Sequence, residues 1–307
     1  MDMSRFRFDG SKKCKLRDIP TDSRNAAGDK KDILKKYEKN LIRLSELQHT
    51  FYSYRKEGLV IVLQAMDAAG KDSLIRHVAS SMNPQGVSVC CLKRPSPEEL
   101  EHDYLWRINK ALPRRGEITI YNRSYYEDIV TADVKHLMKT YPMADRIINI
   151  NEDKFISKRI DQVKHYEEYL YENSYRIIKI FLNLSKETQK KRLLERIDLK
   201  EKNWKFEKAD LDERKVFDTY LDKYENVINK TATEDSPWFV IPADDKWYTR
   251  YIFSEILINT FKKVGASPPT LSAEETANLQ TYRDLLENEQ VTLGSIRPRQ
   301  ANLHSTH

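Results

Sequence analysis

The chain has 307 residues, of which 39% are hydrophobic and 33% charged, with a formal net charge of +6 at pH 7. The sequence contains no apolar stretch of about 18 residues, which argues against a membrane span, and its mixed-charge N-terminus argues against a secretory signal. Three cysteines, two of them adjacent, indicate neither a disulfide framework nor a zinc site. We therefore expect a reduced, cytoplasmic protein with a substantial core.

Helices and strands are predicted to alternate along most of the chain. A long charged helix covers 29–56, with apolar residues at helical spacing, and Gly58 ends it. Runs rich in Val, Ile and Phe predict strands covered on both faces, at 59–66, 87–92, 118–121, 177–184 and 239–241. Helical patterns separate these strands, at 72–82, 97–112, 125–138, 152–173, 186–199 and 246–264. The alternation is typical of an α/β fold with a mainly parallel sheet.

The organisation predicted from these elements is one elaborated domain with an addition at each end. Residues 1–58 form an N-terminal helical extension, 59–264 the core, and 265–307 a C-terminal helix followed by a polar tail from about Gly294. Within the core, 195–213 is dominated by charged residues and almost lacks aliphatic ones. We expect this segment to be part of a projecting flap at about 190–213.

The stretch "LVIVLQAMDAAGKDS", residues 59–73, has the pattern of a phosphate-binding loop between a buried strand and a helix. Such a loop presents backbone N–H groups and a helix N-terminus to an anion, and a Lys reaches the terminal phosphates. Two positions depart from the usual G-x-x-x-x-G-K-[ST] pattern, since Ala65 replaces the first Gly and Asp72 the Ser or Thr. The residues expected to contact phosphate are Ala68, Ala69, Gly70, Lys71, Asp72 and Ser73.

Asp67 helps to decide between a phosphate loop and an ordinary strand–turn–helix junction. An acid beside a polyphosphate is tolerable only where a divalent cation lies between them. Asp67 therefore favours phosphoryl transfer that depends on Mg²⁺, or on Mn²⁺ in its place, over passive anion binding.

A second informative stretch is "RRGEITIYNRSYYEDIV". Asn122 and Arg123 follow the strand at 118–121, at the sheet edge where open α/β sheets bind ligands. Arg123 would supply a fork-shaped cation for the transferred phosphate. Glu127 and Asp128 could touch a metal or a second nucleotide, or they could simply stabilise the start of a helix through its dipole.

Several stretches, in the same order, resemble the polyphosphate kinase 2 family: "QAMDAAGKDS", "NPQGVSV", "HDYLWR", "NRSYYED", "NWKF" and "PWFVIPADDKWYTR". The resemblance runs from about Leu59 to Arg250. It implies a three-layer P-loop kinase fold related to thymidylate kinase, with a helical lid over a channel for inorganic polyphosphate. It also implies Mg²⁺ dependence and a homo-oligomer, either a homodimer or a homotetramer. Asn122 before Arg-Ser resembles the members that phosphorylate nucleoside monophosphates as well as diphosphates.

The resemblance also assigns roles to individual residues. Asp67 corresponds to the loop acid that engages metal and acceptor phosphate, Lys71 to the loop Lys, and Arg123 to the Arg of the second motif. Lys93 matches a basic residue that lines the phosphate channel. Glu127 lies where the family subclass has a Glu near the nucleotide, and we predict it as a second metal ligand.

Two departures from the family pattern stand out. Ser73 and Leu74 replace a frequent Gly-Thr pair, and Asp133 stands where many relatives have Arg. We expect the loss of a cation at Asp133 to weaken binding of the phosphate chain or the nucleotide.

The flap supplies candidate cations for a polyanionic substrate. Arg192 and Arg196 lie at i, i+4 spacing on one helix face, and we predict both as phosphate ligands, with solvated surface charge as the alternative. Further candidates are Lys190, Lys191, Lys202 and Lys205. Trp204 is either a lid anchor packed on the core, which we favour, or a stacking surface. His77 and His102 are expected to be structural, because an ionised acceptor phosphate needs no general base.

The predicted activity is reversible transfer of the terminal phosphate of polyphosphate to ADP, AMP or both, with guanine nucleotides as further acceptors. Neither nucleic acid nor a membrane is expected as a partner. Two alternatives remain open. One is an ATP-dependent small-molecule kinase of the same fold, and the other is a non-catalytic P-loop protein that binds polyanions or nucleic acid through its basic flap.

Overall fold

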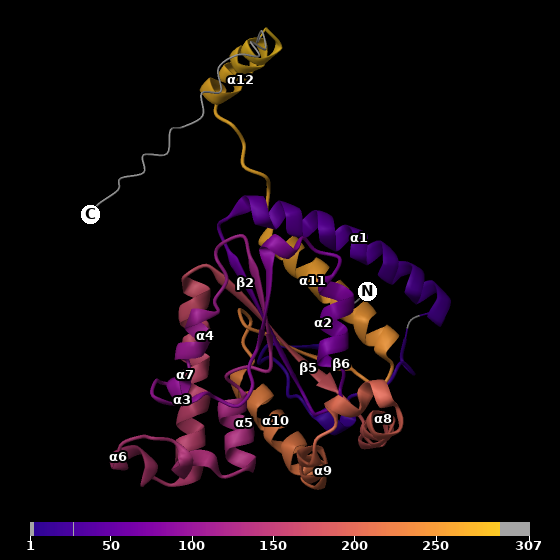
Figure 1. The fold of residues 1–307 in the computed structure, drawn as a ribbon, viewed down its shortest axis with the longest axis vertical. Helices are drawn as coiled ribbons and strands as arrows, with labels where there is room; N and C mark the ends of the chain where they lie inside the picture. The colour runs from indigo at the N-terminus through magenta and orange to yellow at the C-terminus, as the bar shows by residue number, and fades with distance from the viewer. Residues whose placement is uncertain (1–2, 27, 289–307) are drawn as a thin grey trace, which may run out of the picture. The chain divides into compact units, whose positions relative to one another are not determined.

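The computed structural model describes residues 3–26 and 28–288, and its core is a six-stranded sheet with strand order β1-β6-β5-β2-β4-β3 (Figure 1). The strands are β1 (Arg7–Phe8), β2 (Gly58–Ala65), β3 (Val87–Cys91), β4 (Ile118–Asn122), β5 (Tyr175–Asn183) and β6 (Trp238–Pro242). Adjacent strands pair in parallel, except that β1 runs antiparallel to β6. The prediction of a mainly parallel sheet is confirmed, and β1 is an addition that the sequence did not reveal.

The helices largely follow the predicted pattern. They are α1 (Lys30–Tyr54), α2 (Lys71–Ala79), α3 (Pro97–Leu100), α4 (Trp106–Lys110), α5 (Glu127–Val134), α6 (Asp145–Ile148), α7 (Glu152–Glu172), α8 (Lys186–Asp198), α9 (Lys208–Lys215), α10 (Phe217–Thr231), α11 (Lys246–Val264) and α12 (Ala273–Glu287). The prediction of a single helix at 97–112 is wrong. Two short helices form there because Asp103 interrupts the pattern, its side chain accepting from the backbone N–H of Leu105. Helix α10 was not predicted.

Helices cover both faces of the sheet, which gives three layers (Figure 1). Alternate residues of β2 enter two separate cores: Leu59, Ile61 and Leu63 pack with α1, α2 and α11, whereas Val60 and Val62 pack with α5, α7 and α10. A central parallel strand buried on both faces reads as a continuous apolar run, because neither face needs polar residues.

The chain divides into two compact units after Pro268. In the described part of the second unit, α12 buries no side chain, and the predicted polar tail from Gly294 lies outside the described residues. No helix within the described ranges is long and apolar enough to cross a membrane.

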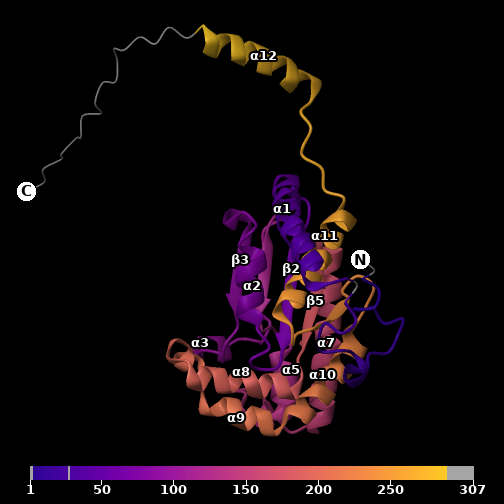
Figure 2. The same ribbon diagram turned by 90° about the vertical axis from the view of Figure 1, so that its right-hand side faces the viewer.

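The carboxyl ends of the central strands lie together at one edge of the sheet. Asn122 at the end of β4 is in register with Leu63 of β2 and Cys91 of β3. The loops that follow these three strands are therefore neighbours. A segment made of α8, a 3-10 turn at Lys200–Lys205 and α9 crosses this edge, and we call it the lid (Figure 2).

Candidate functional site

The loop between β2 and α2 has the geometry of a phosphate-binding loop. Gly70, the N-cap of α2, has a φ of 103°, in the left-handed region that favours glycine. It has no side chain with which to cap the helix. The first backbone N–H groups of α2 and the positive end of its dipole are therefore available to an anion. Lys71, Asp72 and Ser73, three of the predicted phosphate contacts, form this first turn.

Lys71 is held close to the acids of the loop. Its Nζ donates a hydrogen bond to the carbonyl oxygen of Ala65 at 3.2 Å. Burial lowers the pKa of the Lys71 ammonium, and the nearby carboxylates of Asp67 and Glu127 oppose that shift. An ammonium group has three N–H donors, so a lysine that donates one hydrogen bond to a carbonyl oxygen keeps its other donors available for a phosphate.

Asp67 and Arg123 join the two predicted motifs. Arg123 Nη2 lies 3.0 Å from Asp67 Oδ1. Burial alone would raise the pKa of Asp67, but the hydrogen bond with Glu213 and the positive charges of Lys71 and Arg123 outweigh it and hold this pKa well below its usual range. The loop carboxylate is therefore ionised at neutral pH.

Glu213, on lid helix α9, is a member of the site that the sequence did not reveal. It shares a hydrogen bond with Asp67, and its Oε1 accepts from Lys135 Nζ at 2.6 Å. Burial and the adjoining Asp67 raise the pKa of Glu213 to about 7. The flap contains several acids, so nothing in the sequence singles out this one.

The lid and α2 are also linked through the residue that replaces the usual Ser or Thr. Asn122 Nδ2 donates to Asp72 Oδ1 at 2.8 Å, and Lys205 of the lid lies 3.9 Å from Asp72 Oδ2. Ser73 accepts a hydrogen bond from Arg250 Nη2 at 3.1 Å. Asp72 thus connects the loop, the second motif and the lid.

Arg192 braces the phosphate loop from the first lid helix. Its guanidinium is buried and donates to four backbone carbonyl oxygens at 2.7 to 3.0 Å. These belong to Ala68, Ala69, Ala243 and Asp244. The predicted phosphate ligand is thus fully engaged with backbone in this structure, and its contacts are those of a residue that shapes the loop.

Arg196 lies one helical turn further along α8 and has a different environment. Its Nη1 donates to Asp210 Oδ2 at 3.0 Å and to the carbonyl oxygen of Lys205 at 3.2 Å. Its positive charge also contributes to the lowered pKa of Asp67. Arg196 is therefore near the loop acid, while its hydrogen bonds hold the lid together.

Lys93 and Glu127 are the other two predicted contacts. Lys93 follows β3 and is exposed, and its carbonyl oxygen accepts from Arg107 Nη1 at 2.9 Å. Glu127 begins α5 and accepts from Thr131 Oγ1 at 2.7 Å. Burial lowers the pKa of Arg123, but Asp67 and then Glu127 outweigh burial and raise it, which places Glu127 close to the site.

Asp133, where many relatives have a cation, is neutralised within the fold. Lys223 Nζ of α10 lies 2.7 Å from Asp133 Oδ2. The position therefore contributes neither a free positive nor a free negative charge.

Three further residues of the sequence analysis have different outcomes. We favoured the interpretation of Trp204 as an anchor packed on the core. This interpretation is wrong, because Trp204 is 77% exposed. His77 Nδ1 lies 2.8 Å from the carbonyl oxygen of Ser73, and His102 stacks on Trp106 with ring centroids 4.0 Å apart. Both histidines have contacts consistent with a structural role.

The donor set at the loop fits a divalent cation that arrives with its phosphate substrate. Asp67 is an ionised carboxylate and Glu213 adjoins it. Among the described residues no cluster of three or more His, Cys, Asp or Glu side chains could hold a metal ion alone. Mg²⁺ is commonly held by one or two carboxylates, with water and substrate phosphates completing its shell.

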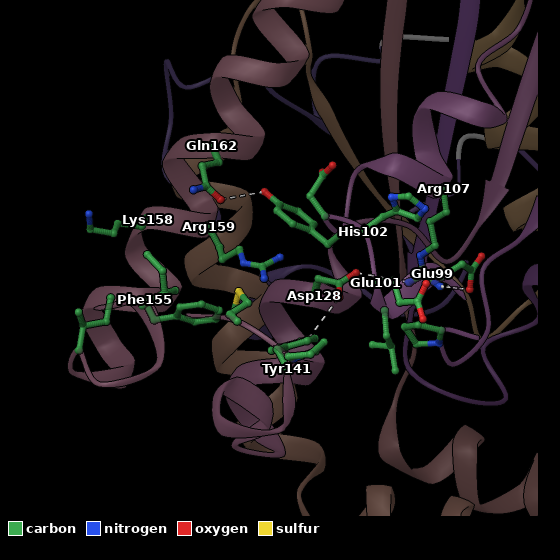
Figure 3. A pocket seen from close by; sticks show the side chains of 18 residues that line it. Glu99, Glu101, His102, Arg107, Asp128, Tyr141, Phe155, Lys158, Arg159 and Gln162 are labelled. Carbon is green, nitrogen blue, oxygen red and sulfur yellow. Dashed lines mark hydrogen bonds and ion pairs between the residues drawn. The ribbon is translucent and has the colours of Figure 1, made fainter. Parts of the chain in front are cut away.

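Arg107 and Asp128 are among the residues that line a cavity of about 460 Å³ (Figure 3). It is bounded by residues 95–107, by Asp128 of α5, by 141–150 and by α7. Arg107, which donates to the carbonyl oxygen of Lys93, is one of its lining residues, so the cavity adjoins the segment that follows β3.

Comparison with known proteins identifies the family. The family model for polyphosphate kinase 2 matches residues 27–267. An ADP-polyphosphate phosphotransferase of Rhodopseudomonas palustris is 44% identical over 246 residues, which are 80% of this chain and 85% of the relative. An AMP/ADP-polyphosphate phosphotransferase of Meiothermus ruber is 40% identical over 227 residues, 74% of this chain and 80% of the relative.

The fold agrees with this similarity. The crystal structure of polyphosphate kinase 2 from Arthrobacter aurescens TC1 superposes with a TM-score of 0.79 at 32% sequence identity. The match covers 90% of this chain and 95% of that one. The predicted P-loop kinase fold is confirmed, and the chain belongs to the polyphosphate kinase 2 family.

Proposed function

We propose that the chain transfers the terminal phosphate of inorganic polyphosphate to ADP, and also to AMP, in a reversible reaction. The observation that carries the proposal is the ionised Asp67 within the phosphate loop, surrounded by Lys71, Arg123 and the lid. An acid in that place suits a site whose substrates bring both negative charge and a divalent cation. Relatives named ADP- and AMP/ADP-polyphosphate phosphotransferases support the same reaction.

The chemistry requires placement and charge compensation. An oxygen of the acceptor's terminal phosphate forms a new P–O bond to the last phosphorus of the chain. The P–O bond to the rest of the chain breaks, and the shortened polyphosphate leaves with the bridging oxygen. Lys71 and Arg123 would offset the negative charge on the moving group, while the N-terminus of α2 orients it. No general base is needed, because the acceptor phosphate is already ionised.

A divalent cation, Mg²⁺ or Mn²⁺, would be held by Asp67, with Glu127 and Glu213 near enough to complete the carboxylate environment. When bound, it would neutralise phosphate charge. Asp67 itself would orient the acceptor, and Arg123 would keep the Asp67 carboxylate in place.

The exposed cations of the lid support the proposal of a channel for polyphosphate, and they need not be rigidly placed. Lys190, Lys191 and Lys205 are exposed, as is Lys93 across the sheet edge. Exposed cations can follow a flexible polyanion at small cost, because they lose little solvation when they meet it.

Purified protein mixed with polyphosphate, Mg²⁺ and ADP should form ATP, and AMP should give ADP. Asp67→Ala and Lys71→Ala should each lower the rate on the order of a hundredfold or more. Omitting polyphosphate is the control that separates this reaction from ATP-dependent kinase chemistry. Failure of the wild-type chain to make ATP from polyphosphate under these conditions would refute the proposal.

We further propose a cytoplasmic location and a homodimer or homotetramer. The three cysteines are all free, which suits a reducing compartment. Light scattering of the purified chain measures the number of subunits directly, and a monomer would contradict the second proposal.

A further inference from the structure

Glu167 of α7 lies in the core, and its carboxylate is surrounded by hydrogen-bond donors. The residue is only 1% exposed. Its Oε1 accepts from the hydroxyl groups of Tyr125 and Tyr126 at 2.7 and 2.8 Å. Its Oε2 lies 2.5 Å from Lys179 Nζ of β5 and also accepts from Ser236 Oγ. One buried carboxylate therefore joins α7 to β5, to the segment before β6 and to the turn that leads into α5.

The ion pair between Glu167 and Lys179 is an unusual way to build a core. Lys179 is fully buried, and its Nζ also donates to the carbonyl oxygen of Thr231 at 2.8 Å. Burial lowers the pKa of Lys179, and the Glu167 carboxylate opposes that shift. Taking two charges out of water is costly, and apolar side chains of similar volume often stabilise a core as well or better. The pair therefore points to a role beyond stabilising the core.

The two tyrosines connect Glu167 to the phosphate site, because they follow Arg123 and Ser124 directly in the chain. Both rings are fully buried in the core. Burial and the Glu167 carboxylate raise the pKa of both hydroxyl groups well above its usual value, so both keep their protons and remain donors. The backbone N–H of Tyr126 also donates to Ser124 Oγ at 3.2 Å. The chain that follows Arg123 is thus fixed by backbone and side chains together.

Arg123 itself has a strained backbone. Its φ of 67° lies in the left-handed region, which is uncommon for a residue with a Cβ atom. Its N–H donates to the carbonyl oxygen of Leu63 at 3.1 Å. Such a conformation persists only where the surrounding contacts impose it. Here the turn directs the Arg123 guanidinium to Asp67 at 3.0 Å, while the tyrosine rings that follow enter the core.

We propose that Glu167 is a positioning residue, which holds the hydroxyl groups of Tyr125 and Tyr126 and thereby fixes the turn that directs Arg123 to Asp67. Lys179 and Ser236 would keep the carboxylate in place. A displacement of about 1 Å at the guanidinium would weaken its contact with the moving phosphate far more than it would weaken substrate binding. This inference rests on the proposed function and adds a residue of the core to those that the reaction needs.

Two double variants of the full chain form a matched pair. Glu167→Gln/Lys179→Met removes both charges but keeps one oxygen for the tyrosine hydroxyl groups, whereas Glu167→Met/Lys179→Met removes that oxygen as well. With polyphosphate, Mg²⁺ and ADP, the Met/Met variant should lower kcat about tenfold to a hundredfold, with each KM changed less than about threefold. The Gln/Met variant should keep kcat within about threefold of the wild type. Equal losses of kcat in the two variants would overturn the inference.

A destabilised control separates positioning from general damage. Leu170 lies one turn further along α7, is 2% exposed and belongs to the same core. Leu170→Ala should lower the midpoint of thermal unfolding, because it leaves a cavity, yet keep kcat within about twofold at a temperature at which the variant is folded. A fall in kcat as large as that of the Met/Met variant would show that lost stability alone is the cause.

A change at Arg123 tests whether Glu167 acts through this residue. In Arg123→Lys, a flexible ammonium group replaces the guanidinium fork and depends less on a fixed turn. Adding Glu167→Met/Lys179→Met to this variant should lower the remaining kcat less than about threefold. A loss as large as the one in the wild-type background would overturn the inference.

Single tyrosine variants cover the case in which the Met/Met variant fails to fold. Tyr125→Phe and Tyr126→Phe each remove one hydroxyl group and leave the other bonded to Glu167. At least one should lower kcat about fivefold or more with KM little changed, and wild-type kcat in both would overturn the inference. A wild type that makes ATP no faster than these variants refutes this inference alone, whereas a wild type that makes no ATP refutes the proposed function.

Discussion

The phosphate loop and the lid both carry charged residues, but they hold them in different ways. In the loop, the positions of Lys71 and Arg123 follow from a strand, a tight turn and a helix, and both cations converge on the single carboxylate Asp67. In the lid, several cations are paired with acids of the lid itself, as in Arg196 with Asp210 at 3.0 Å. Lys202 and Lys215 are paired in the same way.

This difference shows that a count of basic residues does not measure the charge available to a substrate. Exposed pairs in the lid are weak and can exchange their acid for a polyphosphate at little cost. The loop cations are fixed by the fold around one acid. Arg192 belongs to the lid by sequence but to the loop by its contacts.

The largest expected effect is on kcat/KM, and it should differ between a variant of a loop cation and a variant of a lid cation. Lys71→Met should lower kcat/KM for ADP on the order of a hundredfold to a thousandfold, because the moving phosphate loses its fixed cation. Lys215→Met, the lid control because Lys215 is paired with Asp212 of the lid, should lower it less than about fivefold. Steady-state rates with polyphosphate in excess measure both, and similar losses in the two variants would contradict the distinction.

Arg192 tests whether a lid residue can be part of the loop scaffold. Arg192→Met should lower the free energy of unfolding by about 2–4 kcal/mol, since four buried carbonyl groups lose their donor. Arg192→Lys should be nearly as unstable, because one ammonium cannot replace a guanidinium fork. Urea denaturation measures this loss. A stable Arg192→Lys with a raised KM for polyphosphate would instead indicate a substrate ligand.

Glu213 of the lid is linked to Asp67 of the loop by a hydrogen bond, and its protonation should depend on folding. Its pKa rises from 4.5 to about 7 in the folded protein, so the folded state keeps a proton that the unfolded chain loses first. Its contribution to the free energy of unfolding is therefore complete below pH 4.5 and is lost as pH rises to about 7. The free energy of unfolding, measured in the presence of a chelator across this pH range, should fall by about 2 kcal/mol more in the wild type than in Glu213→Gln. Parallel curves would exclude the coupling.

The smallest effect is expected from an exposed lid lysine. Lys190→Met should raise the KM for polyphosphate less than about twofold at physiological salt, because one solvated charge is well screened. Its effect should grow as salt is lowered. A tenfold change at physiological salt would show that the lid binds polyphosphate through fixed contacts.

The sequence predicted the parts of the site that are local in the chain. Asp67, Gly70 and Lys71 lie in one strand–turn–helix unit, and Arg123 follows the adjacent strand, so pattern and strand order were enough to bring them together. The apolar runs likewise predicted the central strands, because burial on both faces leaves a clear signal.

What the sequence did not reveal depends on contacts between distant segments. β1 has two residues and exists only because it pairs with β6. Glu213 resembles any other acid of a charged flap, and Arg159 resembles any other cation of an exposed helix until folding buries it against Tyr104. The contacts of Arg192 with backbone carbonyls could not be predicted, since such carbonyls leave no pattern in a sequence.

The most direct test of the account follows a phosphorus label from polyphosphate. Polyphosphate labelled with ³²P, incubated with the wild-type chain, Mg²⁺ and unlabelled ADP, should place the label in the γ-phosphate of ATP, with one ATP formed for each phosphate removed from the chain. Label that appears only as free inorganic phosphate, or ATP that forms without label, would contradict direct transfer at the loop of Asp67 and Lys71.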